Sequence, residues 1–217
     1  MRASAGNDTA KAEVYFTRAV HEAEGFGPQD PRLGPTLNSL GLVYHARGKY
    51  REAEAVYLRA LAILLKVYGP SSLDVANVSL NLGTSYFDDG LYARSEPYFR
   101  DAWRIFDRSL GPDSIKTARA VFGLGETCRQ LKRYAAAVPL LRQAADIPER
   151  ILGLVNPETA AALNGLALAY SGIGKQAEAE KIFKLVSGIR AGAPGASSNQ
   201  AGTLEAERLP RRTMQKP

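Results

Sequence analysis

Residues 37–61 read LNSLGLVYHARGKYREAEAVYLRAL, and this stretch decides the fold. Its first half places Leu37, Leu40 and Tyr44 at positions i, i+3 and i+7, which lie on one face of a helix. Its second half, after a turn at Gly48, repeats that spacing of apolar residues. The stretch therefore predicts two amphipathic helices joined by a short turn.

The same pattern returns along the chain with a constant period of about 42 residues. Three positions hold the period through four copies: Leu40, Leu82, Leu124 and Leu166; Gly41, Gly83, Gly125 and Ala167; Tyr44, Tyr86, Cys128 and Tyr170. Self-similarity at a fixed period is typical of solenoids, in which stacked units share one continuous core. The sequence therefore predicts an all-α repeat protein built from helix pairs.

Helix boundaries follow from residues that suit the ends of helices. The expected N-caps, which accept an unpaired backbone N–H, are Asp30, Ser72, Ser114 and Asn156. We expect first helices over 35–47, 73–89, 115–131 and 157–173, and second helices over 51–68, 93–110, 135–152 and 176–190. Pro35 is expected to shorten the helix in which it lies, and Pro148 is expected to kink its helix.

Three segments are expected along the chain. Residues 1–7 are predicted to be a flexible N-terminus. Residues 8–190 are predicted to form the repeat array, in which a lone second helix over about 8–24 precedes four helix pairs. Residues 191–217 are rich in Gly, Ala, Ser, Pro and charge, so we expect a disordered tail there.

Composition argues against several classes of site. The single cysteine, Cys128, takes a tyrosine position of the buried seam and is expected to fill the core. Trp103 shares the register of Leu61, and we expect it to pack in the core or between repeats. His21 and His45 lack cysteines or paired carboxylates at ligand spacing, so neither a metal nor a cofactor is expected.

The same sequence carries no nucleotide-binding loop and no nucleophile motif, so we do not expect an enzyme. The net charge of +6 is spread along the chain instead of forming a basic stripe, which makes nucleic acid an unexpected partner. No run of about 18 apolar residues and no signal peptide is visible, and a cytoplasmic location is expected.

The residues quoted above, with Gly48-Lys49-Tyr50 and Glu52-Ala53-Glu54, resemble the tetratricopeptide repeat. The period of about 42 residues is similar to that of the kinesin-light-chain subtype, whose first helix the stretch NPETAAALNGLALAY at 156–170 also resembles. The resemblance implies a right-handed α-solenoid of helix–turn–helix repeats. It also implies that the first helices line a concave groove, which holds a peptide.

Carried over by position, the resemblance implies a groove made by each unit in turn: Asn38, Leu42 and His45; Asn77, Asn81, Thr84, Phe87 and Asp88; Arg119, Phe122, Glu126, Arg129 and Gln130; Asn164, Leu168 and Ser171. The amides of Asn38, Asn81 and Asn164 are expected to pair with a peptide backbone, since an amide both donates and accepts. The first unit lacks the lysine and second asparagine with which some tetratricopeptide domains grip a C-terminal carboxylate, so chaperone tails are not the expected ligand.

Three functions stay open. The first is a non-catalytic protein–protein interaction scaffold that binds a peptide or protein partner in the groove. The second is a regulatory or interaction segment of a larger enzyme or signalling protein, because the chain begins in the middle of a repeat. The third is weak RNA binding by the basic surface. Membranes and small-molecule substrates are not expected partners.

Overall fold

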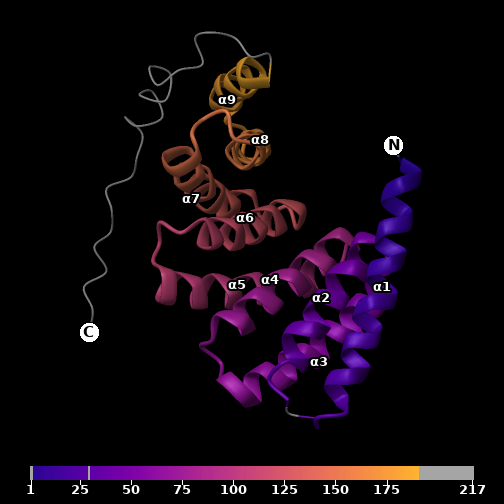
Figure 1. The fold of residues 1–217 in the computed structure, drawn as a ribbon. Coiled ribbons are helices and arrows are strands. Elements are labelled where there is room, and N and C mark those ends of the chain that lie inside the picture. Colours follow the sequence, from indigo (N-terminus) through magenta and orange to yellow (C-terminus); the bar gives the residue numbers. More distant parts are fainter. Residues whose placement is uncertain (1, 29, 191–217) are drawn as a thin grey trace, which may run out of the picture.

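A computed structural model describes residues 2–28 and 30–190, and every regular element within them is an α-helix. The helices are α1 (Arg2–Glu24), α2 (Leu33–Ala46), α3 (Tyr50–Tyr68), α4 (Leu73–Asp88), α5 (Tyr92–Leu110), α6 (Ile115–Gln130), α7 (Tyr134–Leu152), α8 (Pro157–Gly172) and α9 (Gln176–Arg190). Figure 1 shows them stacked in chain order, from α1, α2 and α3 at the lower right to α8 and α9 at the top. The predicted disordered tail, 191–217, lies outside the described residues.

The helices of the four pairs begin and end within two residues of their predicted bounds. The difference is larger at α1, which begins at Arg2 and not at residue 8. A helix that is already nucleated gains one hydrogen bond for each residue it adds, so extension costs little. The helix thus continues through most of the segment 1–7, where a flexible N-terminus was predicted.

Three of the four predicted N-caps are confirmed. Their side chains accept a backbone N–H of the first turn: Ser72 from Val75 at 3.2 Å, Ser114 from Lys116 at 3.2 Å and Asn156 from Glu158 at 2.8 Å. These bonds satisfy donors that a helix start leaves unpaired. The starts of α4, α6 and α8 are therefore fixed by local chemistry that the sequence already shows.

The prediction for Asp30 is wrong, because α2 begins at Leu33 and has Arg32 at its N-cap position. The Asp30 carboxylate instead accepts the backbone N–H of Arg32 at 2.9 Å and its guanidinium at 2.8 Å. Pro35 lies in the first turn of α2, where its missing N–H costs nothing, and α2 has 14 residues against 16 in each of α4, α6 and α8, as the prediction of a shortened helix requires. Helix α7 continues as one α-helix through Pro148, which is buried, and the kink expected there stays a prediction.

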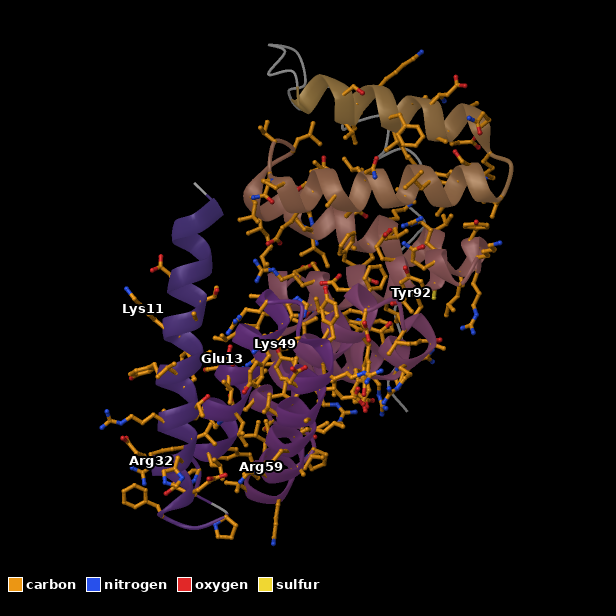
Figure 2. The ribbon with its side chains drawn as sticks, turned by 90° about the vertical axis from the view of Figure 1, so that its right-hand side faces the viewer. Lys11, Glu13, Arg32, Lys49, Arg59 and Tyr92 are labelled. Atoms are coloured by element: carbon orange, nitrogen blue, oxygen red, sulfur yellow. The ribbon has the colours of Figure 1, made fainter. Side chains whose placement is uncertain are left out.

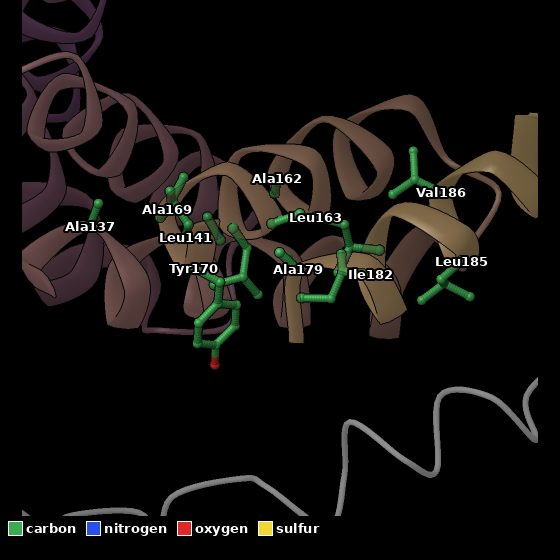
Figure 3. Close-up of a cluster of buried hydrophobic side chains, with 14 of the residues drawn as sticks. Ala137, Leu141, Ala162, Leu163, Ala169, Tyr170, Ala179, Ile182, Leu185 and Val186 are labelled. Carbon is green, nitrogen blue, oxygen red and sulfur yellow. The ribbon is translucent and has the colours of Figure 1, made fainter. Parts of the chain in front are cut away.

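The core consists of three groups of buried side chains in chain order. One joins α1 to α4, a second joins α6 to α9, and a small third group of Ala76, Ala102, Phe106 and Ala120 lies between them. Figure 3 shows the second group, in which Leu141 of α7, Leu163 of α8 and Ile182 of α9 come together. Stacked repeats thus share one continuous interior.

The predictions for Cys128 and Trp103 are confirmed. Cys128 is buried in the core group of α6 to α9, and burial raises the pKa of its thiol. Trp103 is half-buried and packs against both this group and the small group of α4 to α6. Both residues therefore serve packing.

Glycines set the distance between neighbouring helices. A methyl group placed on Gly83 of α4 would lie 3.0 Å from the ring of Phe99 on α5, and one on Gly123 of α6 would lie 2.4 Å from the same ring. Leu141 of α7 lies in the same way between Gly125 of α6 and Gly165 of α8. In α5 and α7, one large side chain thus fits between two first helices that carry no side chain at the contact.

Ion pairs attach α1 to the array. Glu13 bonds to Lys49 with an Nζ–Oε1 distance of 2.9 Å and also pairs with Arg47, both in the turn between α2 and α3. Glu24 pairs with Arg59 of α3 at 2.6 Å. Figure 2 shows Glu13 beside Lys49. The lone helix is therefore bound to the first pair by charge as well as by its apolar face.

Leu82→Ala tests the register of the core. Leu82 is 0% exposed, so its truncation leaves a cavity and is expected to lower the free energy of unfolding by roughly 2–5 kcal/mol. Leu58→Ala is the matched control, because Leu58 lies on the surface and should change stability by less than about 0.5 kcal/mol. Urea unfolding followed by circular dichroism measures both, and equal losses would contradict the register.

Asp30 is expected to titrate well below other aspartates. The hydrogen bonds from the side chain and backbone of Arg32 lower the pKa of its carboxyl to about 2. Because the pKa of Asp30 is lower in the folded state, its carboxylate stabilises the fold at pH values above the ordinary aspartate pKa of about 3.9. This stabilisation is lost as the pH falls towards 2. Carboxyl ¹³C NMR titration measures the pKa. Arg32→Ala should return it towards the ordinary value, and an unchanged low value would contradict this account.

Candidate functional site

The four first helices form one continuous face. Among the described residues the backbone of α2 lies close to that of α4, α4 lies close to α6 and α6 lies close to α8, whereas the backbones of α3, α5, α7 and α9 do not lie close to one another. Side chains still join α3 to α5, because Glu54 pairs with Arg94 at 2.6 Å. Elements that lie closer together occupy the inside of a curved stack. We call the surface of α2, α4, α6 and α8 the inner face, and it is where the predicted groove residues lie.

Polar side chains of the inner face bond across neighbouring repeats. The Asn81 amide donates to the Asn38 carbonyl oxygen at 2.9 Å, and Lys116 donates to the amide oxygen of Asn77 at 3.2 Å. Arg119 pairs with Glu158, with an Nε–Oε1 distance of 3.0 Å. Two of the three predicted peptide-binding amides, Asn38 and Asn81, thus bind each other. Each still has unused hydrogen-bonding capacity, because an amide offers two donors and two acceptor lone pairs.

A second row crosses the inner face where the first helices end. His45 and Phe87 occupy one register in successive repeats, and each packs edge to face on the tyrosine that starts the next helix. The ring centroids are 5.7 Å apart for His45 and Tyr50, and 5.2 Å apart for Phe87 and Tyr92. His45 also pairs with Asp88 of the neighbouring repeat at 3.3 Å.

Arg129 continues this row one repeat later. Its guanidinium binds both oxygens of Glu126, at 3.0 Å from Nε and 2.8 Å from Nη2. This hydrogen bonding raises the pKa of Arg129, and nearby Tyr134 and Tyr92 raise it further. The pair is fork-shaped, which fixes the guanidinium in place. We call the side chains of His45, Phe87 and Arg129 with Tyr50, Tyr92 and Tyr134 the terminal row.

The remaining predicted residues differ in how far they reach the surface. Leu42 and Leu168 are 45% and 38% exposed and present apolar surface on α2 and α8. Phe122 instead packs against the core, so it contributes to stability. Thr84 donates its hydroxyl hydrogen to the Leu80 carbonyl at 2.9 Å. Asn164, Gln130 and Ser171 are half-buried on the same face.

Lys116 and Glu158 were not among the predicted groove residues, because their partners on neighbouring helices are 39 residues away instead of one full period. The tyrosines of the terminal row were not predicted as members of this site either. Their signal was present, because Tyr50, Tyr92 and Tyr134 keep the same period as His45, Phe87 and Arg129.

Two classes of arrangement are not found in the part of the chain that the structure describes. Residues 2–28 and 30–190 hold no group of three or more His, Cys, Asp or Glu side chains able to bind a metal ion. No described helix is long and apolar enough to cross a membrane.

Family models of the tetratricopeptide repeat match residues 4–66, 74–150 and 159–190. The chain belongs to the tetratricopeptide-repeat family. No protein with curated annotation matches the sequence. Tetratricopeptide repeats generally mediate protein–protein interaction and are generally non-catalytic.

Solved structures with low sequence identity share this tetratricopeptide fold. BtubC (BKLC) from P. vanneervenii is 22% identical with a TM-score of 0.77, over 99% of this chain and 82% of that chain. A putative kinesin light chain from Podosopora anserina is 20% identical with a TM-score of 0.74, over 89% and 92%. MamA of AMB-1 is 20% identical with a TM-score of 0.60, over 87% and 98%. The predicted kinesin-light-chain-like repeat is thus confirmed at the level of the fold.

Glu126→Ala tests whether the Glu126–Arg129 pair is structural. Both side chains are mostly buried, at 14% and 19% exposure, so the change leaves a guanidinium without its partner. The free energy of unfolding is expected to fall by roughly 1.5–3 kcal/mol. Glu22→Ala, in the exposed pair with Arg18, is the control and should cost only about 0.3–0.5 kcal/mol. Thermal and urea unfolding give both values, and equal small losses would contradict the structural role.

Proposed function

We propose that this protein is a non-catalytic scaffold that binds a peptide or protein segment along its inner face. The terminal row is the observation that carries the proposal. It places a histidine, a phenylalanine and a guanidinium at one register on three successive first helices. Aromatic and arginine side chains are enriched among the residues that dominate binding at protein interfaces.

The contacts of the row support a surface that is ordered before a ligand arrives. Phe87 is held against Tyr92 and Arg129 against Glu126, so neither side chain has to be immobilised on binding. Binding then costs less conformational entropy. The unused amide groups of Asn38 and Asn81 supply donors and acceptors for a backbone alongside this row.

The charge arrangement weighs against the RNA-binding alternative. Arg119 pairs with Glu158, and Arg129 pairs with Glu126. Asp88 adds a further carboxylate beside His45. A face that alternates in sign lacks the basic stripe with which proteins neutralise phosphates. The cytoplasmic location stays a prediction.

The test uses exposed leucines of the inner face, because Phe122 also supports the core. The variant Leu42→Glu/Leu168→Glu places two charges on apolar surface that a ligand would cover. Partners captured by the parent chain are identified by mass spectrometry, and the affinity of the principal partner is then measured by calorimetry. The double variant is expected to weaken that affinity by at least about tenfold, equivalent to about 1.4 kcal/mol.

The matched control is Leu58→Glu/Leu152→Glu, which adds the same charges at exposed leucines of α3 and α7. It should bind as tightly as the parent. Equal affinity of the inner-face variant and the parent would refute binding on this face, and circular dichroism shows whether each variant is folded.

A further inference from the structure

A groove of about 340 Å³ lies on the side of the array formed by the second helices. We call it the outer groove. Leu61 and Leu65 of α3 and Ile105 of α5 line its apolar part, while Arg108 of α5 and Ser71 of the α3–α4 loop lie at its polar part. It exists because α3 and α5 both pack on α4 while their backbones stay apart. The Glu54–Arg94 ion pair joins the two helices, and neither residue lines the groove.

The next repeat shows what fills the equivalent place. The register of Leu61 is occupied by Trp103 one repeat later. Trp103 packs against the core groups on both sides of it. The smaller Leu61 packs against only the core group of α1 to α4, and apolar space stays open beside it. The larger side chain of Trp103 therefore occupies a position beside which space stays open in the earlier repeat.

The polar part of the groove differs in the same way. In the later copy, Arg150 pairs with the carboxylate of Asp113. The residues one period earlier are Arg108 and Ser71, so the arginine is kept while its acidic partner is a serine. Among the described residues, no carboxylate pairs with Arg108. The guanidinium thus faces the groove at a place where the chain itself supplies a carboxylate in the next repeat.

The charges around the groove leave a net positive rim. Arg104 and Arg108 both line it, and Asp101 is the carboxylate that lines it with them. Asp101 lies 3.8 Å from Arg104, and both side chains are more than half exposed, which makes that pair weak. The complementary ligand therefore carries a negative charge next to an apolar group. A second copy of this chain fits poorly, because its net charge is +6.

We propose that the outer groove binds an acidic segment of another protein, with an apolar side chain in the space beside Leu61 and a carboxylate paired with Arg108. The segment supplies from outside what Trp103 and Asp113 supply within the chain one repeat later. This site lies on the second helices, so it does not depend on binding at the inner face.

The probe is an array of capped nonapeptides in which large apolar residues alternate with Asp and Glu, with matched arrays that carry Asn and Gln or Lys instead. The parent chain is expected to bind members of the acidic array and to show no comparable binding to the neutral or basic arrays. The affinity of the best acidic peptide is then measured by fluorescence anisotropy. Failure of every acidic peptide to bind, or equal binding of the neutral array, overturns the proposal.

Two variants give the outer groove the residues that the next repeat has at the equivalent positions. Ser71→Asp supplies Arg108 with an internal carboxylate and should weaken the best peptide by about three- to fivefold. Leu61→Trp fills the apolar space and should weaken it by at least about tenfold. The matched control is Ser71→Asn, which has the size of the aspartate without its charge and should bind like the parent.

Each remaining outcome decides the question. Unchanged affinity in both Ser71→Asp and Leu61→Trp places the peptide elsewhere and overturns the proposal, as does an equal loss in Ser71→Asn. Thermal unfolding shows that Leu61→Trp is folded, and Arg108→Gln provides a second test in which the loss should match that of Ser71→Asp. The inner-face variant Leu42→Glu/Leu168→Glu should keep full peptide affinity, so that failure of one site does not mimic failure of the other.

Discussion

The spacing of neighbouring helices depends on large side chains of second helices that pack against glycines of two first helices. Phe99 lies between Gly83 and Gly123, and Leu141 lies between Gly125 and Gly165. A side chain at Gly123 or Gly125 would overlap the ring or the branched chain, and one at Gly83 or Gly165 would crowd it, so side chains at these positions would push neighbouring helices apart. Their absence brings α4 close to α6 and α6 close to α8, while the backbones of the second helices stay apart. Both the inner face and the outer groove depend on this difference.

Close first helices place polar side chains of successive repeats within bonding distance. The Asn81–Asn38 bond and the Arg119–Glu158 pair each cross from one repeat to the next. Such contacts hold neighbouring units in register, as expected in a repeat array whose stability comes from interfaces between adjacent units. A ligand bound as proposed on the inner face would therefore meet side chains already fixed in position, and not a set of free polar groups.

Separated second helices have the opposite consequence. The space between them is filled only where a side chain is large enough, as at Trp103, and it stays open beside Leu61. The helix pairs thus keep the same arrangement from repeat to repeat, while the side chains between second helices decide whether a groove is filled or open. Variation between copies, at positions that the fold does not need, is a physical route to a binding surface.

The sequence by itself determined the period, the helix pairs and three of the four caps, because these depend on local chemistry repeated along the chain. It also indicated that the predicted groove residues lie on the first helices and that Cys128 fills the core. Tertiary structure alone decided that Asn38 and Asn81 bond to each other, that Phe122 supports the core, and that Asp30 bonds to Arg32 instead of capping α2. These outcomes depend on distances between side chains of different helices or on the path of a loop. A helical pattern records which face a residue occupies, but not which partner lies opposite it.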